Sequence, residues 1–228
     1  MGRKYNNLVK DYSVKRLMKQ EYMEWILKKH YAKRRCSVSY AFGLIKDLQI
    51  FGVCTFGYPP NYMYNKGRCL FNDLEVTTLE LNRLVTNDLD KNCLSYFVSQ
   101  CLKLLPKPMA VISYADPNVY HTGYIYQATN WYYTGTSTPK KRYHFEDGST
   151  FDIRRGIHTK GNIVKVEKMK PTFRYLYLLG NKKEKKNMFR KLKMKLLPYP
   201  KGDNKRYDSS DLEMYMQNDL FDGGKNDL

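Results

Sequence analysis

VISYADPNVYHTGYIYQATNWYYTG, residues Val111–Gly135, is the stretch around which the fold of this chain is built. It begins within the apolar run Met109–Ile112. It then gathers a hydroxyl, a carboxylate, an imidazole and two carboxamides among tyrosines: Ser113, Asp116, His121, Gln127 and Asn130. Because α/β proteins place ligand chemistry at strand ends and in the loops that follow, this pattern predicts a buried strand that ends in a functional site. The alternative is an aromatic-rich structural segment.

The segments on either side of this stretch predict a mixed α/β fold. Apolar spacing indicates helices over 13–31 and 90–105, a helix after residues 113–117, and strands over 38–44, 50–56, 76–85, 109–114 and 173–179. It also indicates a hairpin over 143–155, turning at Asp147–Gly148, and a helical stripe over 182–195. The order predicts a mostly antiparallel sheet flanked by helices, with a basic C-terminal extension. A Rossmann fold is excluded, because no GxGxxG or GxxxxGK[ST] motif occurs.

The net charge of +18 is the strongest property of the whole chain. Such a balance predicts a polyanionic partner, with nucleic acid ahead of anionic lipid. The alternative is a merely soluble, lysine-rich protein. The charge is uneven, because residues 160–206 are strongly basic and the segment from residue 208 onward is acidic. We therefore predict one domain over residues 1–202 and a mobile acidic tail over 203–228.

Several classes of protein are disfavoured by what the sequence lacks. No apolar run is long enough to span a membrane, and the first residues lack the apolar core of a secretory signal. The five cysteines form no CxxC pair, so the sequence indicates neither a zinc cage nor a disulfide framework. Reduced thiols in a cytoplasmic protein are the simplest interpretation, and Cys93 and Cys101 are expected in the core.

A set of short motifs spread over most of residues 14–202 points to a family. The motifs are His30–Tyr31, FGYPP at Phe56–Pro60, LELNRL at Leu79–Leu84, SYADP at Ser113–Pro117, HTGYIYQATNWYY at His121–Tyr133, Tyr175–Gly180 and LPYPK at Leu197–Lys201. In this order they resemble the Mom family of bacteriophage DNA-modification proteins, which are divergent members of the GNAT acyltransferase architecture. SYADP followed by GYIYQATN is the most specific of them.

The resemblance implies an enzyme that alters the exocyclic amine of adenine in double-stranded phage DNA. In the family the product carries a carbamoylmethyl group, which shields the phage genome from host restriction enzymes. The protein would then act in the cytoplasm of the infected bacterial host. Neither the resemblance nor the sequence indicates an oligomeric state.

The GNAT-like architecture implies a donor site at the start of the second long helix. There the helix N-terminus would receive the pyrophosphate of an acyl-CoA-like donor, with Arg83, Val85, Asn92 and Ser95 as the cofactor-binding residues. The usual Arg/Gln-x-x-Gly-x-Gly/Ala pattern is absent from Leu84–Asn92, and Asp88 and Asp90 would repel a pyrophosphate. A carbamoylmethyl group is also joined through a methylene carbon, which acyl transfer from a thioester does not produce.

The same resemblance suggests catalytic roles for four residues. Asp116 would orient or deprotonate the adenine amine, and its alternative role is to cap a turn before Pro117. Tyr126 would act as a proton donor, and its alternative role is a core aromatic. His30 and Tyr31 would supply an acid or base, and His30 with Asp116 could bind an iron-type metal ion. The alternative for His30 is a helix-end cap.

A flipped base would need stacking and hydrogen-bonding partners, and the DNA backbone would need cations. The candidates for the base are Ser113, Tyr120, His121, Gln127, Asn130 and Trp131. The candidates for phosphates are Arg154, Arg155, Lys182 and Lys183, although a solvated lysine face is the alternative for the run that begins at Lys182. Two other functions compete with DNA modification: a non-catalytic DNA-binding protein on the same fold, and an acyl-CoA-dependent N-acyltransferase with another substrate.

Overall fold

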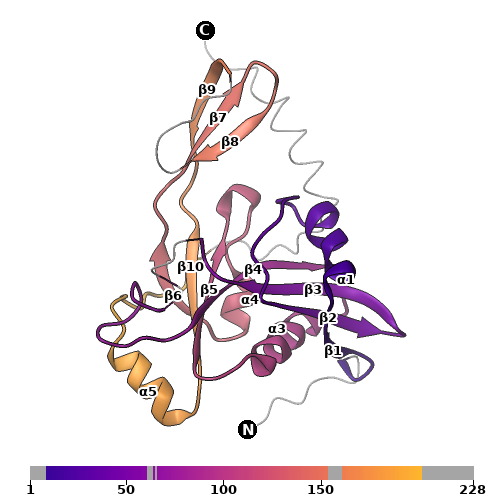
Figure 1. The fold of residues 1–228 in the computed structure, drawn as a ribbon, viewed down its shortest axis with the longest axis vertical. Coiled ribbons are helices and arrows are strands. Elements are labelled where there is room, and N and C mark those ends of the chain that lie inside the picture. The colour runs from indigo at the N-terminus through magenta and orange to yellow at the C-terminus, as the bar shows by residue number, and fades with distance from the viewer. Residues whose placement is uncertain (1–8, 61–63, 65, 154–160, 202–228) are drawn as a thin grey trace. The chain divides into compact units, whose positions relative to one another are not determined.

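The computed structural model describes residues 9–60, 64, 66–153 and 161–201 (Figure 1). The chain divides into two compact units. The first unit comprises residues up to Val111 together with Leu178–Lys193, and the second comprises Ile112–Tyr177 together with Met194–Gly202. The strand order is β1-β2-β3-β4-β5-β10-β6 in a seven-stranded sheet and β8-β7-β9 in a three-stranded sheet.

The first unit is built on four strands that follow one another as antiparallel neighbours: β1 (Ser13–Arg16), β2 (Tyr40–Lys46), β3 (Gln49–Gly57) and β4 (Thr78–Thr86). The hairpin predicted over 38–56 is therefore confirmed. In the register of the ladder, Val53 lies opposite Val85. Both side chains belong to the same buried cluster.

Helices cover both faces of these strands. Helix α1 (Lys19–Glu24) runs into the π-helix η2 (Trp25–Lys29), and Trp25 packs on the face that presents Val53. Helix α3 (Cys93–Leu104) lies on the opposite face. The Cys101 thiol is hydrogen-bonded to the Cys54 thiol, and Cys54, as the neighbour of Val53 in strand β3, points away from the Val53 face. The predicted core positions Cys93 and Cys101 are both fully buried.

The helix predicted over 13–31 is wrong in its first third. Ser13–Arg16 pairs with β2 as an edge strand, and the helix begins only at Lys19. Leu17 packs directly on Gly43 of β2, where a Cβ atom would lie 2.8 Å from a leucine methyl carbon. The three-and-four spacing of apolar residues matched a helix by chance, because Met18, which the pattern placed on the apolar stripe, is 66% exposed.

The second unit follows from β5 (Met109–Ala115), which the sequence predicted as a buried strand. After it come the 3₁₀ turn η3 (Pro117–Val119), the helix α4 (Tyr124–Ala128) and the strand β6 (Tyr132–Thr136), which pairs antiparallel with β10 (Phe173–Leu179). The three-stranded sheet consists of β7 (Lys141–Phe145), β8 (Thr150–Ile153) and β9 (Ile163–Lys168).

Several further predictions can be compared with these elements. The hairpin turn at Asp147–Gly148 is confirmed between β7 and β8. The basic stripe forms helix α5 (Lys182–Arg190) in the first unit, capped by Asn181. Strands β6 and β9 were not predicted. The mixed, mostly antiparallel sheet flanked by helices is confirmed, and no described helix is long and apolar enough to cross a membrane.

Replacing Leu17 by alanine tests the corrected N-terminal element. Leu17 is 8% exposed against the sheet, so Leu17→Ala should lower the free energy of unfolding by about 2–4 kcal/mol. Met18→Ala is the matched control and should change it by less than about 0.5 kcal/mol, since that side chain is exposed. Urea unfolding would measure both. Equal losses would instead support one amphipathic helix that buries both residues.

Candidate active site

The end of strand β5 holds two buried hydroxyl groups in contact. Ser113 is 1% exposed, and its Oγ donates a hydrogen bond to the phenolic oxygen of Tyr126 at 2.7 Å. The ring of Tyr126 packs against Trp131 and Tyr175, with ring centroids 5.0 and 5.1 Å apart. Tyr126 is therefore a core aromatic whose hydroxyl is fixed at the strand end. Its role as a proton donor stays a prediction.

Asp116 caps the turn that follows the strand. Its Oδ1 accepts hydrogen bonds from the backbone N–H of Asn118 at 2.9 Å and from the Asn118 amide at 2.6 Å. The turn-capping role considered for Asp116 is therefore present in the structure. Both bonds fall on Oδ1, and among the described residues no hydrogen bond reaches Oδ2. One carboxylate oxygen thus holds the turn, while the other remains available to a ligand.

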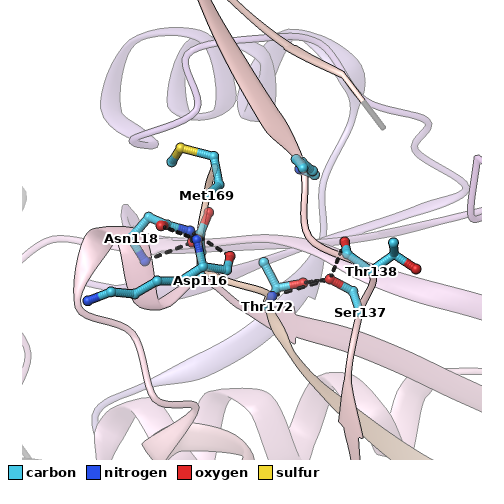
Figure 2. Close-up of a pocket in the computed structure, with 8 residues that line it drawn as sticks. Asp116, Asn118, Ser137, Thr138, Met169 and Thr172 are labelled. Carbon is cyan, nitrogen blue, oxygen red and sulfur yellow. Dashed lines mark hydrogen bonds between the residues drawn. The ribbon is translucent and has the colours of Figure 1, made fainter. Parts of the chain in front are cut away.

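A very small hollow of about 10 Å³, the space of roughly one water molecule, lies beside Asp116. Figure 2 shows the side chains that line it. Asn118 forms one wall, because its amide donates to the carbonyl of Lys170 at 3.0 Å and its carbonyl accepts the Lys170 N–H at 2.9 Å. The hydroxyls of Ser137 and Thr172 lie 2.8 Å apart on the other side. The remaining lining residues are Thr138, Lys140 and Met169.

The hollow combines one carboxylate with two lysines and three hydroxyl groups. Lys140 and Lys170 provide positive charge, while Ser137, Thr138 and Thr172 provide donors and acceptors. A phosphodiester needs cations and hydroxyl donors, and an amino group needs a carboxylate acceptor. The lining therefore presents groups that can contact a phosphate or an amino group at its opening, although the hollow is too small to enclose a nucleotide.

His121 returns from the turn toward Asp116. Its backbone N–H donates to the carbonyl of Asp116 at 3.0 Å. Burial lowers the pKa of the His121 imidazole below its usual value, and the nearby Asp116 carboxylate opposes that shift without cancelling it. The ring is thus mainly neutral at pH 7. A neutral imidazole beside a carboxylate can accept a proton.

Tyr175 of β10 fixes the loop between the turn and helix α4. Its hydroxyl donates to the carbonyl of Thr122 at 2.6 Å and accepts a hydrogen bond from the Gln127 amide at 3.2 Å. Burial raises the pKa of Tyr175 to about 12, so it stays a donor. Gly123 has a φ of 86°, and a Cβ there would collide with the Tyr175 ring. The Gln127 amide is thereby engaged in the fold.

The other residues expected to contact a base differ in their exposure to solvent. Trp131 is fully buried, with its ring against Tyr126 and Tyr177. In this position it belongs to the core, so stacking on a base would require the ring to leave it. Tyr120, by contrast, is 44% exposed, and Asn130 is also exposed.

His30 and Tyr31 belong to the first unit. His30 ends the π-helix η2, is 6% exposed, and its Nδ1 accepts the backbone N–H of Ala32 at 3.1 Å. Its ring lies 4.3 Å from that of Tyr31. In the neutral ring this bond places the proton on Nε2, so His30 could bind a metal ion only by giving up its hydrogen bond to Ala32. The predictions that His30 and Tyr31 face Asp116, and that His30 and Asp116 share a metal, involve both units and stay predictions.

The four residues predicted to bind a donor occupy one strand and the start of one helix. Val85 is buried, and the Ser95 hydroxyl donates a hydrogen bond to the carbonyl of Asn92 at 3.0 Å. Arg83 is 9% exposed and donates to the carbonyls of Asn82 and Arg34, at 2.6 and 3.1 Å, whereas its Nε has no partner. Of the four residues, Arg83 is the one with a buried N–H group that lacks a hydrogen-bond acceptor.

The start of helix α3 does not offer the neutral phosphate cradle of an acyl-CoA enzyme. Asp90 lies just before the helix, where it accepts a hydrogen bond from the Tyr12 hydroxyl at 3.3 Å and lies 3.9 Å from the Lys46 ammonium. Asn92 takes the left-handed conformation at the helix cap, with a φ of 70°. A carboxylate at this end opposes an incoming pyrophosphate.

The residues predicted to hold phosphates lie partly within the described chain. Lys182 and Lys183 are exposed in the first turn of α5. Arg154 and Arg155 lie outside the described residues. Among the residues that the structure does describe, no group of three or more His, Cys, Asp or Glu side chains is placed to hold a metal ion.

Sequence reasoning missed most of the hollow. Asn118, Ser137, Lys140, Lys170 and Thr172 were not predicted, because single polar residues in loops carry no spacing signal. Only the pairing of the segments before β7 and after β9 brings them together, through Met169 N–H to the Lys140 carbonyl at 3.0 Å.

Comparisons with known proteins relate nearly the whole described chain to one family. A model of the Mom protein family matches residues 11–201. The chain is 27% identical over 220 residues to the methylcarbamoylase mom of Escherichia phage Mu, covering 86% of this chain and 89% of that protein. An N-acetyltransferase from Staphylococcus aureus Mu50 is similar in structure with a TM-score of 0.41 and 12% identity, over 73% of this chain and 98% of that one.

The lowered pKa of His121 makes a prediction about stability. On acidification the unfolded chain takes up a proton at the ordinary histidine pKa, about 6.5, before the folded protein does. The stability that depends on the neutral ring is therefore present above that pH and is lost as the pH falls below it. His121→Gln should lose less free energy of unfolding between pH 7.5 and 5.5 than the wild type, as measured by urea titration. Equal losses would contradict a partly buried ring that stays neutral in the folded protein.

Proposed function

The chain belongs to the Mom protein family, and from this membership we propose that it is a phage DNA-modification enzyme that alters the exocyclic amine of adenine. The observation that carries the proposal is the extent of the family match, which runs through His30–Tyr31, Arg83 and the whole of the Asp116 site. The relative in phage Mu, a methylcarbamoylase, supports transfer of a carbamoylmethyl-type group. Protection of phage DNA from host restriction is the proposed benefit.

The charge of the chain supports double-stranded DNA as the partner. A net charge of +18 supplies the counter-charge that a polyphosphate requires. The exposed lysines of α5 and the two lysines of the hollow are positioned on the surface, where phosphates can reach them. Most of the binding free energy would therefore depend on salt concentration.

The chemistry has to overcome the weak nucleophilicity of an adenine amine, whose lone pair is delocalised into the ring. The net change forms an N–CH₂ bond and breaks two bonds: one N–H bond of the amine, whose proton has to leave, and the bond between the methylene carbon and the donor's leaving group, which departs with the electron pair. We assign Oδ2 of Asp116 to accept a hydrogen bond from the amine, which orients its nitrogen. His121, mainly neutral at pH 7, then takes the proton. Since the base lies inside the duplex stack, it has to be extruded first.

The donor of the transferred group would use the first unit. Arg83 is a nearly buried guanidinium, and among the described residues it has no carboxylate partner. It therefore suits a carbonyl or anionic group of the donor. An acyl-CoA thioester is a poor candidate, since it would leave a carbonyl carbon on the amine and would meet Asp90 at helix α3.

A non-catalytic DNA-binding protein is the second candidate. Two observations favour it: Asp116 already has a structural role as a cap, and Trp131 is fully buried. A protein that only binds DNA would need the positive surface but no neutral imidazole beside an uncommitted carboxylate oxygen. The arrangement of Asp116 and His121 therefore favours the enzyme over this alternative.

The decisive variant is Asp116→Asn. Asparagine is as good a turn cap as aspartate, so the Asn118 N–H keeps its acceptor while the negative charge is lost. The protein would be expressed with a plasmid, whose nucleosides are then analysed by mass spectrometry for a modified deoxyadenosine. The initial rate of accumulation should fall by about 100-fold or more.

Asp147→Asn is the matched control for that experiment. Asp147 also caps a turn, because its Oδ1 accepts the Ser149 N–H at 2.8 Å, but it lies in the β7–β8 hairpin away from the hollow. It should leave the modification unchanged. No modified deoxyadenosine from the wild type would refute the enzyme, and equal accumulation from Asp116→Asn and the wild type would remove Asp116 from the mechanism.

Helix α5 offers a test of phosphate contact. Replacing Lys182 and Lys183 by glutamine should weaken binding to duplex DNA of any sequence. It should also reduce the slope of log K against log salt by about 2. Fluorescence anisotropy over a salt series measures both quantities. Lys103→Gln with Lys107→Gln removes the same charge elsewhere on the first unit and should leave the slope near that of the wild type. Equal slopes in both double variants would indicate a merely solvated face on α5.

A further inference from the structure

The three-stranded sheet β8-β7-β9 has one face that no role has yet been assigned to. We call the strands β7, β8 and β9 together the arm. Residues 137–140 lead into it from β6, and residues 169–172 lead back to β10 (Figure 1). Tyr143 lies opposite both Phe151 and Val166, so these three positions share one face. Val164 shares it too, since it lies two residues before Val166.

The apolar side chains on this face are exposed. Phe151, Val164 and Val166 have exposed fractions of 54%, 60% and 51%, whereas Tyr143 at the centre is 8% exposed. Isolated exposed apolar residues are ordinary, but three on one face of a small sheet form a patch that favours a binding partner.

Both faces of the arm carry cations, because Arg142 and Lys165 lie on the face opposite Tyr143 and Val166. Lys141 lies directly opposite Lys168, and this pair shares the face of Tyr143 and Val166. Glu167 belongs to the opposite face, where its Oε2 lies 3.3 Å from Nε2 of His144. Like charges that face each other across two strands are unfavourable without an anion between them. The apolar residues are thus bordered by two lysines. This combination favours a binding partner that presents negative charges beside apolar groups, as the phosphates and bases of a nucleic acid do.

The base of the arm forms part of the hollow beside Asp116. The Ser137 N–H donates to the Thr172 carbonyl at 2.8 Å, and the Met169 N–H donates to the Lys140 carbonyl at 3.0 Å, which joins the two connecting segments. The Asn118 amide donates to the Lys170 carbonyl at 3.0 Å, and the Asn118 side-chain carbonyl accepts the Lys170 N–H at 2.9 Å. These bonds link the segments that carry the arm to the turn that carries Asp116.

We propose that the face of the arm formed by Lys141, Tyr143, Phe151, Val164, Val166 and Lys168 binds in a groove of duplex DNA beside the nucleotide that is modified. This inference rests on the proposed function and names the surface that recognises its substrate. Lys141 and Lys168 contact phosphates, while Val164, Val166 and Phe151 lie against base edges and thymine methyl groups. The major groove, about 12 Å wide, admits a two-stranded β-ribbon, and the outer strands of the three-stranded arm are about 10 Å apart, so its face lies along the groove rather than at its floor.

The two kinds of contact give different signatures in a salt series. The probe is a fluorescently labelled duplex of about 20 base pairs bound to the full chain, measured by anisotropy. Lys168→Gln should reduce the slope of log K against log salt by about 1, since one phosphate contact is lost. Lys165→Gln is the matched control, because it removes the same charge from the opposite face of the same strand, and it should leave the slope unchanged.

The apolar contacts are tested by Val164→Ser combined with Val166→Ser. Affinity should fall about five- to tenfold at every salt concentration, with an unchanged slope, because no charge is lost. Circular dichroism of each variant shows whether the arm sheet is retained. Should the serine pair disturb the sheet, Val166→Thr, which keeps the branched shape, is expected to give a smaller loss in the same direction.

Three outcomes would overturn the proposal. Equal slopes for Lys168→Gln and Lys165→Gln would show that the two faces are equivalent. Unchanged affinity of the serine variant would exclude the apolar contact. A change in oligomeric state by light scattering, without a change in DNA affinity, would identify the face as an interface between copies of this chain. The nucleoside assay is separate: modified deoxyadenosine with a dispensable arm refutes only the arm, and arm-dependent binding without modification refutes only the enzyme.

Discussion

The buried hydroxyl of Tyr175 is the contact on which the candidate site depends. It joins the Thr122 carbonyl to the Gln127 amide, and Gly123 lets the backbone pass directly over its ring. The loop between β5 and α4 would otherwise leave polar backbone groups buried without partners, at a cost of about 1–3 kcal/mol each. With the loop fixed at this end, His121 is held close to Asp116 and α4 turns Tyr126 toward Ser113.

The site reuses groups that the fold already needs. Oδ1 of Asp116 holds the turn through Asn118, and the Tyr126 ring fills the core while its hydroxyl meets Ser113. Folding therefore constrains the direction in which Oδ2 of Asp116 points. An uncommitted carboxylate oxygen on a rigid turn loses little entropy when it binds an amine, which is the advantage of a preorganised site.

The sequence predicts those parts of the fold and site that depend on local patterns. The strand before Ser113, the Asp147–Gly148 hairpin and the buried cysteines of α3 follow from periodicity and turn chemistry. Ser13–Arg16 was misassigned because pairing with β2 outweighs a helical spacing that happened to fit. The hollow was missed because Asn118 and Lys170 are far apart in the chain, and only hydrogen bonds to backbone bring them together.

Several acidic residues of the described chain bind groups that are close to them in sequence. Glu75 binds Arg68, and Glu184 closes the cap of α5. Lys141, Lys168, Lys182 and Lys183, in contrast, have no carboxylate partner among the described residues. A protein that needed only solubility would gain nothing from setting Lys141 against Lys168 on an apolar face, because mutual repulsion lowers the stability of the sheet. The unbalanced charge is better explained by an anion supplied from outside, which would relieve that repulsion when it binds.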